Sequence, residues 1–302
     1  MESRPDQPSV SMTRRRSRVA VLATLALALV LAGCSGGQPN PDPVDLGDVA
    51  TPGAVSSVTS VGALGDSVTL GVNACDEPGW CPARSWATGD DPGVGSVALR
   101  IGAATGTFPE TENAAKDGGT LADGIGNADD VIAADPQLVL LLLGGNDVCS
   151  RDMDTMTSVD DFRTGYTTLL TKLSTELPDA TLVAMSIPNL YMVWELGHQQ
   201  DAAVDVWAKS SSCRNLLGDP RATGQEDVER REAVATRNAE LNQVISEVCT
   251  SDLNCTYDDG ALFDYKFAPE EISSIDYFHP SAVGEAVIAE MAWDVVVEAM
   301  SQ

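Results

Sequence analysis

The sequence predicts an α/β protein, a three-layer α/β/α sandwich around a mainly parallel, five-stranded sheet. Two observations lead to this prediction. Short apolar runs alternate along the chain with amphipathic helices, and residues 136–143 (PQLVLLLL) form an almost unbroken apolar run. Such a run is typical of a strand in a parallel sheet that is covered on both faces. The alternation places helices on both faces, because parallel strands need crossover connections.

Each element follows from its own pattern. The first strand is predicted at Val58–Leu64 and ends at Gly65. Thr120–Ala134 is predicted as a helix, since its apolar residues recur at helical spacing. Further strands are expected at 107–113, 136–143, 180–187 and 254–258, and further helices at 94–104, 159–177, 226–248 and 282–300. Insertions are expected at 72–92 and at about 189–224.

The N-terminal region predicts export. Residues 14–18 (RRRSR) precede an uncharged apolar stretch, 19–33, of the length found in signal peptides. This stretch ends in Leu-Ala-Gly followed by Cys34, which resembles the lipobox of bacterial lipoproteins. The resemblance implies a signal peptide at 1–33, lipidation of Cys34, and an extracytoplasmic protein anchored by lipid to the bacterial cell membrane. A transmembrane anchor and an ordinary cleaved peptide are the alternatives.

A polar segment separates this signal from the rest of the chain. Residues 34–57 are rich in Pro, Gly, Ser and Asp and are expected to form a flexible tether. A single domain then spans 58–302.

The charge of the chain excludes one class of partner. The formal net charge is −27, with 18 Lys+Arg and 45 Asp+Glu. Without residues 1–33 there remain 13 basic and 43 acidic residues. Such a surface repels a phosphate backbone, so we expect no nucleic-acid partner. A hydrophobic content of 43% is enough for a packed core.

Six cysteines remain after Cys34, and an even number in an exported chain indicates disulfides. Proximity in the chain favours Cys75–Cys81 and Cys249–Cys255, which leaves Cys149–Cys213. A zinc site is the alternative, but it needs closely spaced Cys or His residues that the sequence lacks. We therefore expect three disulfides and no metal.

Four short motifs follow predicted strands or precede the last helix. They are Gly65-Asp66-Ser67, Asn113-Ala-Ala-Lys-Asp-Gly118-Gly-Thr120, Gly144-Gly-Asn146-Asp147 and Asp276-Tyr-Phe-His279-Pro280. In an open α/β sheet all of them gather at the carboxyl edge of the strands. In this order and at this spacing they resemble the SGNH (GDSL-type) hydrolase family, over residues 59–300. The resemblance implies a flavodoxin-like sheet and a serine ester hydrolase.

The chemistry of these motifs assigns roles. Ser67 Oγ is a weak nucleophile and needs a base, for which His279 is the candidate. Asp276, three residues earlier, is close enough to orient His279. His198 is the other histidine and is expected at the surface or at the rim of the pocket. By the resemblance, the oxyanion hole consists of the Ser67 and Gly118 backbone N–H groups and the Asn146 side chain.

The expected function is a carboxylesterase or lipase, or a lysophospholipase-like enzyme, that needs no cofactor. The insertion with Cys75 and Cys81 is similar to disulfide-containing esterases and lipases of actinobacteria. We expect an ester substrate and a monomer. Carbohydrate O-deacylation and a non-catalytic ligand-binding lipoprotein are the alternatives. Residues expected to line the wall of the acyl site, or else to pack in the core, are Tyr191, Met192, Trp194 and Trp207.

Overall fold

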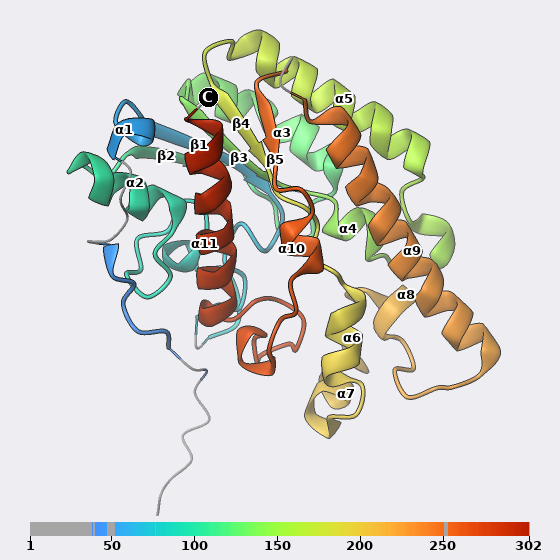
Figure 1. Cartoon of the computed structure of the whole chain (residues 1–302). Helices are drawn as coiled ribbons and strands as arrows, with labels where there is room; N and C mark the ends of the chain where they lie inside the picture. The colour runs from blue at the N-terminus through green and yellow to red at the C-terminus, as the bar shows by residue number, and fades with distance from the viewer. Residues whose placement is uncertain (1–37, 39, 47–51, 76, 251–252, 302) are drawn as a thin grey trace, which may run out of the picture. The chain divides into compact units, whose positions relative to one another are not determined.

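The computed structural model describes the chain except residues 1–37, 39, 47–51, 76, 251–252 and 302 (Figure 1). The predicted signal segment, Cys34 and parts of the predicted tether therefore lie outside the described residues. All described residues belong to one compact unit. None of the helices described is both long enough and apolar enough to cross a membrane.

A five-stranded parallel sheet forms the centre of this unit. Its strands are β1 (Ser60–Gly65), β2 (Glu110–Asn113), β3 (Leu138–Leu142), β4 (Thr181–Ala184) and β5 (Cys255–Tyr257), in the order β2-β1-β3-β4-β5. All four neighbouring pairs are parallel. This is the flavodoxin-like strand order: β2 is added on one side of β1, and β3, β4 and β5 are added on the other. The predicted fold class is confirmed.

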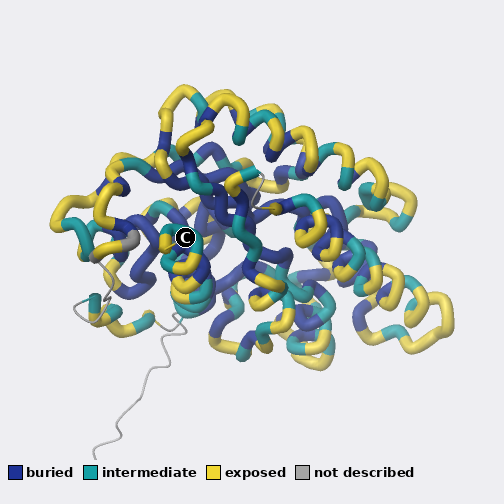
Figure 2. The backbone as a smooth tube through the Cα atoms, turned by 45° about the horizontal axis from the view of Figure 1, so that its top comes forward, coloured by how far each residue is buried: buried dark blue, intermediate teal, exposed yellow. Residues whose placement is uncertain are grey.

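Helices cover both faces of the sheet, and the strands in the middle are largely buried (Figure 2). The strand register decides which side chain meets which helices. Ala63, Leu140 and Val183 lie in one row and belong to the core that includes helices α2 (Val97–Thr105) and α11 (Ala282–Ala299). The next row, Leu64, Leu141 and Ala184, belongs to the opposite core. Its helices are α3 (Leu121–Ala134), α5 (Val159–Glu176) and α9 (Gln225–Val248). All five residues of β3 are buried, as the apolar run predicted.

The observed strands are shorter than predicted, for local reasons. β3 begins two residues after Pro136, which has no N–H to donate to a ladder. β4 ends at Ala184, and the Ile187 N–H donates to Asn242 Oδ1 on α9 instead of to a strand, at 2.7 Å. Helix α2 begins at Val97, three residues late, because the Ser96 Oγ accepts the Leu99 N–H and caps it.

The two predicted insertions differ in structure. Residues 72–92 are mostly irregular, with one 3₁₀ turn at Pro82–Arg84. Residues 189–224 contain three short helices, which pack near the carboxyl end of the sheet (Figure 1). These are α6 (Tyr191–Gly197), α7 (Asp201–Trp207) and α8 (Arg214–Leu217). The remaining short elements are α4 (Gly145–Val148), α10 (Ala261–Asp264) and 3₁₀ turns at Met153–Thr155 and Pro269–Glu271.

Part of the predicted tether lies against the domain. Residues Pro52–Val55 form the short helix α1, and Val55 is fully buried in the core beside α2. Upstream, the Val44 N–H donates to the Pro92 carbonyl at 2.9 Å. The structured part of the chain thus begins before residue 58, because apolar residues within the polar segment find a face of the domain to cover.

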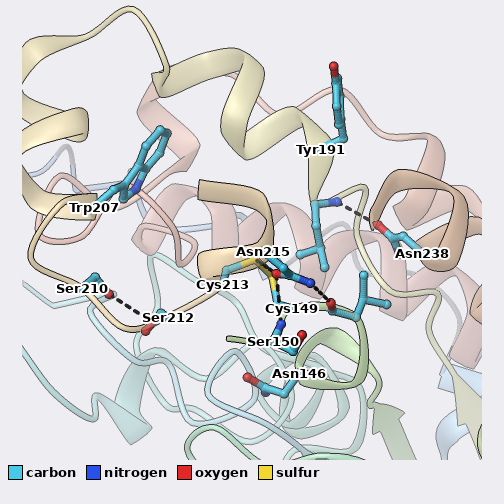
Figure 3. The surroundings of a disulfide bond; sticks show 12 residues. Asn146, Cys149, Ser150, Tyr191, Trp207, Ser210, Ser212, Cys213, Asn215 and Asn238 are labelled. Carbon is cyan, nitrogen blue, oxygen red and sulfur yellow. Dashed lines mark hydrogen bonds between the residues drawn. A yellow bond between two sulfur atoms is a disulfide. The ribbon is translucent and has the colours of Figure 1, made fainter. Parts of the chain in front are cut away.

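Three disulfides join Cys75 to Cys81, Cys149 to Cys213, and Cys249 to Cys255. These are the pairs that the sequence order favours. The second bond connects residues 64 positions apart and ties the end of α4 to the start of α8 (Figure 3).

Candidate active site

Ser67 lies in the turn that follows β1. The strand ends at Gly65, where a Cβ would come within 2.0 Å of the Thr69 Oγ1, so only glycine lets the chain turn this tightly. The turn is closed by the Asp66 Oδ1, which accepts the Val68 N–H at 3.0 Å. Ser67 is buried at the carboxyl edge of the sheet, as the motif predicted.

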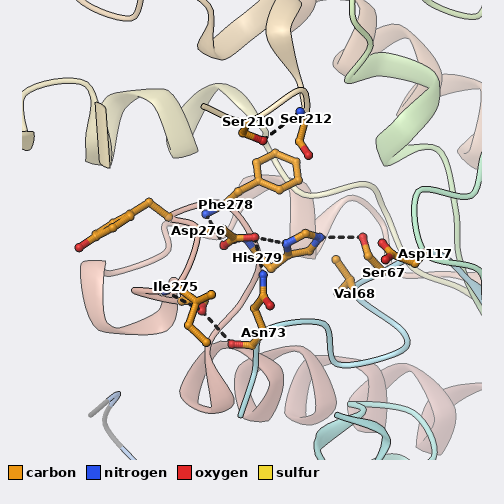
Figure 4. A network of polar contacts seen from close by, with 12 residues as sticks. Ser67, Val68, Asn73, Asp117, Ser210, Ser212, Ile275, Asp276, Phe278 and His279 are labelled. Atoms are coloured by element: carbon orange, nitrogen blue, oxygen red, sulfur yellow. Dashed lines mark hydrogen bonds and ion pairs between the residues drawn. The ribbon is translucent and has the colours of Figure 1, made fainter. Parts of the chain in front are cut away.

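Ser67, His279 and Asp276 form one hydrogen-bonded row (Figure 4). The Ser67 Oγ lies 2.8 Å from the His279 Nε2, although 212 residues separate them in the chain. On the other side of the ring, the His279 Nδ1 hydrogen-bonds to the Asp276 Oδ2. The other carboxylate oxygen of Asp276 accepts the backbone N–H groups of Phe278 at 3.0 Å and of His279 at 3.1 Å. The loop before α11 therefore holds acid and base together.

Burial and neighbouring charges shift the pKa values of His279 and Asp276. Burial favours the neutral imidazole, but the hydrogen bond and charge of Asp276, with smaller contributions from Asp66 and Asp117, raise the pKa of His279 above its ordinary value. Burial likewise acts to raise the pKa of Asp276, yet the hydrogen bond and charge of His279, with the backbone donors, hold it below the ordinary value. Asp276 is therefore ionised, and His279 is a stronger base than an ordinary histidine.

A second carboxyl group lies beside the serine. Burial raises the pKa of Asp66 to about 6, against the lowering effects of the Val68 N–H and of His279. Asp147, by contrast, braces a loop: its carboxylate accepts the Leu121 N–H at 2.8 Å and the Thr157 hydroxyl at 2.7 Å. Both aspartates thus hydrogen-bond to groups of the loops around the site.

The three groups of the predicted oxyanion hole line one cleft next to the serine. In the described part of the chain, neither the Ser67 N–H nor the Gly118 N–H has a hydrogen-bond partner. Gly118 has φ = +66°, a conformation that suits glycine. Asn146, on α4, donates from its Nδ2 to the Gly119 carbonyl at 2.9 Å, which fixes its amide at the cleft. The Asn146 Nδ2 also donates to the Asp66 Oδ2, at 3.4 Å. The two backbone N–H groups are thus the unpaired donors of the cleft, where negative charge can develop.

Two hollows of different character meet at Ser67 and His279. A cavity of about 60 Å³ is lined mainly by apolar side chains, including Ile187, Leu190, Val193 and Phe267. A cleft of about 210 Å³ is polar. Both are bounded by Ser67, Asn146, Phe278 and His279, and the polar cleft adds Asp117, Gly118, Ser150, Arg151, Ser211, Ser212 and the Cys149–Cys213 bond.

Only one of the four residues expected in the wall of the acyl site lines the apolar cavity. Met192 lines the apolar cavity, but Tyr191, Trp194 and Trp207 do not. The Trp207 Nε1 donates to the Asp276 carbonyl at 3.2 Å, so this side chain supports the loop before α11. His198 stacks on Trp194, with ring centroids 4.2 Å apart, and takes no part in the row at Ser67. The sequence could not separate these residues, because the apolar side chains of a short helix show no pattern that tells which of them face a cavity and which pack in the core.

Sequence reasoning missed Asn73. Its Nδ2 donates to the Asp276 Oδ2 at 2.8 Å, from a loop 203 residues away in the chain (Figure 4). From the sequence alone, an asparagine in a polar insertion is an ordinary turn residue. No group of described His, Cys, Asp and Glu residues has a geometry that could hold a metal ion.

Comparisons with known proteins identify the family of the chain. The model of the GDSL-like lipase/acylhydrolase family matches residues 63–287, well over half of the chain. No curated protein sequence matches. Among solved structures, a lipase/acylhydrolase from Enterococcus faecalis is 20% identical, with a TM-score of 0.52, over 79% of this chain and 95% of that one.

A second similar structure is an alpha/beta hydrolase enzyme from the metagenome of Lake Arreo, Spain. It is 15% identical, with a TM-score of 0.50, over 81% of this chain and 97% of that one. At these identities the likeness concerns the fold. The family match covers all four motifs, from the strand before Ser67 to the helix after His279. The chain is a member of the GDSL-like lipase/acylhydrolase family, and hence an SGNH-type ester hydrolase.

Proposed function

We propose that this protein cleaves carboxylic esters by a serine mechanism in which Ser67 is the nucleophile, His279 the general base and acid, and Asp276 the residue that orients His279. One observation supports this most directly: the Ser67 Oγ lies 2.8 Å from the His279 Nε2 while the Asp276 carboxylate holds the opposite ring nitrogen. Nucleophile, base and orienting acid in this relation are the requirement for activating a serine.

The reaction proceeds in two halves. Ser67 Oγ attacks the ester carbonyl carbon while its proton passes to the His279 Nε2. The oxyanion accepts hydrogen bonds from the Ser67 and Gly118 N–H groups and from the Asn146 amide. His279 then gives its proton to the departing alcohol, leaving an acyl-enzyme. Water attacks this ester, His279 takes a proton from the water, and returns it to Ser67 as the acid leaves.

The apolar cavity and the polar cleft suit different halves of an ester substrate. The apolar cavity bounded by Leu190 and Val193 suits the acyl chain, because apolar surface gains by leaving water. The polar cleft with Arg151 and Ser212 suits the alcohol half of the ester. This division favours a lipase, carboxylesterase or lysophospholipase-like enzyme that acts on an apolar acyl group joined to a polar alcohol.

The substrate is tested with p-nitrophenyl esters of increasing chain length. We expect kcat/KM to rise beyond acetate, and Val193→Trp, which fills the apolar cavity, to move the optimum to shorter chains. Because the polar cleft also suits a sugar, carbohydrate O-deacylation is the second candidate. A sharp preference for acetate in both proteins would favour it.

The mechanism is tested with a fluorophosphonate probe, which labels only an activated serine. We expect labelling of the intact protein and none of Ser67→Ala, with ester cleavage lower by several orders of magnitude because the triad acts as a unit. Absence of label on the intact protein would instead support a non-catalytic ligand-binding lipoprotein. Near-normal cleavage by Ser67→Ala would refute the serine mechanism.

We propose that the chain acts outside the cytoplasm as a monomer, anchored by lipid on Cys34 after removal of residues 1–33. The disulfides support an oxidising compartment. In this proposal residues 34–57 connect the lipid to the hydrolase domain of residues 58–302, and Gln38 and Val44 of this segment hydrogen-bond to the domain. The test is Cys34→Ser in a bacterial host. We expect the variant to appear in the soluble fraction and the parent chain in the membrane fraction; equal partition would contradict lipid anchoring.

A further inference from the structure

The side chain of Asn73 completes the hydrogen-bond shell of Asp276. Its Nδ2 donates at 2.8 Å to the Asp276 Oδ2, the same oxygen that holds the His279 Nδ1 (Figure 4). The other oxygen, Oδ1, takes the Phe278 and His279 N–H groups. Each oxygen therefore has two donors, and Asn73 supplies the only one of the four, in the described chain, that comes from outside the 276–279 loop.

Asn73 is itself held in place. Its Oδ1 accepts the Gly79 N–H at 2.9 Å, so the amide nitrogen must face Asp276. Its backbone N–H donates to the Gly79 carbonyl at 2.8 Å, and its carbonyl accepts the Ser273 hydroxyl at 2.8 Å. The residue is 9% exposed and has φ = +60°, a conformation that asparagine tolerates. The Cys75–Cys81 disulfide closes the same loop.

We propose that Asn73 is a positioning residue for the reaction: it fixes the plane of the Asp276 carboxylate and so the direction in which His279 faces Ser67. The inference rests on the proposed function, because it acts through the triad. Without this donor the carboxylate is held less firmly, because the three remaining donors all come from the 276–279 loop itself. Such a loss affects the transition state more than substrate binding, since Asn73 lines neither hollow.

The donor also moderates the charge of Asp276. A carboxylate that lacks one hydrogen bond carries more negative charge toward His279 and stabilises the imidazolium more strongly. The other charged groups near His279 are Asp66, Asp117 and, across the polar cleft, Arg151, and these do not change. Removal of the Asn73 amide therefore moves the acid limb of the kcat/KM profile to higher pH.

Two substitutions separate this role from a purely structural one. Asn73→Gly keeps the left-handed backbone and removes the side chain. Asn73→Asp keeps the shape and the acceptor for the Gly79 N–H, and replaces only the donor that faces Asp276. The matched control is Asn254→Gly, because Asn254 also has positive φ (54°) and uses its amide for one loop contact, with the Pro178 carbonyl, away from the site.

We expect kcat to fall about ten- to hundredfold in Asn73→Gly, with KM within about twofold. Asn73→Asp should lose more, and its acid limb should lie at the highest pH of the three proteins, because it adds a carboxylate beside Asp276. Asn254→Gly should match the parent enzyme in kcat and in its pH profile. The measurements are kcat, KM and full pH profiles, with thermal unfolding of each variant.

A different pattern overturns the inference. If Asn73→Asp keeps parental kcat at pH values where both carboxyl groups are ionised, the donor has no positioning role. The same holds if Asn73→Gly loses only thermal stability, without a change in kcat or pH profile. Failure of the proposed function is recognised separately, because it appears as activity in Ser67→Ala whatever the Asn73 variants do.

Discussion

His279 is flanked by carboxylates on more than one side, and its protonation controls the chemistry. The Asp276 carboxylate, with Asp66 and Asp117 farther away, raises its pKa although burial opposes this. Attack needs the neutral ring, so activity should rise with pH through a midpoint above that of an ordinary histidine. We expect the kcat/KM profile to show this limb, His279→Ala to abolish it with the activity, and His198→Ala to leave both unchanged. An acid limb at or below the ordinary histidine pKa would contradict the assignment.

Asp66 permits a second test, in which stability is measured as a function of pH. Its pKa is raised from 3.8 to about 6, so the folded state holds a proton that the unfolded state releases. Stability therefore falls as pH rises through this window, by up to about 3 kcal/mol. In Asp66→Asn this loss is absent. We expect the melting temperature of the variant, relative to the parent, to increase between pH 4 and pH 7.

The same substitution should lower the acid limb of kcat/KM, because a charge that favours the His279 imidazolium is removed. This is the opposite of the shift expected for Asn73→Gly. A constant difference in melting temperature across the pH range would show that the Asp66 carboxyl is not titrating in the folded protein.

Single residues also show how far sequence reasoning reaches. Ser67, Asp276, Gly118 and Asn146 were named because each belongs to a motif with a fixed spacing, and they lie together. Asn73 belongs to no such motif. Its partner is 203 residues away, and only the fold brings the two together. Contacts of this kind depend on tertiary structure, which local pattern does not contain.

At the scale of elements, apolar patterns predicted the five strands and the long helices, because each long helix buries apolar residues in one of the two cores. Strand ends were less predictable, since side-chain contacts such as that of Ile187 with Asn242 end the ladder early. The short helices α6 to α8 were expected only as an insertion. In seven residues or fewer, no apolar stripe develops from which periodicity can be read.

The Cys149–Cys213 bond is the element-scale feature closest to the site, since both cysteines line the polar cleft (Figure 3). Asn215 supports the same junction by donating to the Val148 carbonyl at 2.8 Å. Closing a loop of this length stabilises the fold by about 4 kcal/mol, against about 2 kcal/mol for the six-residue loop of Cys249–Cys255.

We therefore expect the double variant Cys149→Ser/Cys213→Ser to unfold at a lower temperature than Cys249→Ser/Cys255→Ser. It should also have a lower kcat/KM well below its unfolding temperature, because Asn146 lies on the helix that the bond anchors. The Cys249→Ser/Cys255→Ser control should retain kcat/KM within about twofold. Equal losses of activity in the two double variants would indicate that the bond has no special relation to the site.

At the scale of the whole molecule, one sheet edge collects residues from four parts of the chain. The strand order β2-β1-β3-β4-β5 puts the turn after β1 next to the loops after β2 and β3, and the last loop before α11 reaches the same edge. The sequence predicted this convergence from the motifs. It did not predict that the polar segment upstream of α1 would cover part of the domain, because that segment has little periodicity of its own.

The segment upstream of α1 hydrogen-bonds to the loops that support the site. The Gln38 Nε2 donates to the Asn73 and Cys75 carbonyls, its Oε1 accepts the Ser274 N–H, and the Val44 N–H donates to the Pro92 carbonyl. Gln38 thus bridges the loops that carry Asn73 and Asp276. In Gln38→Ala/Val44→Pro we expect about 2 kcal/mol less stability, a melting temperature lower by a few degrees, and reduced kcat. Asp42→Ala, at an exposed position of the same segment, is the control. Identical melting and kcat in all three proteins would mean that the segment only connects.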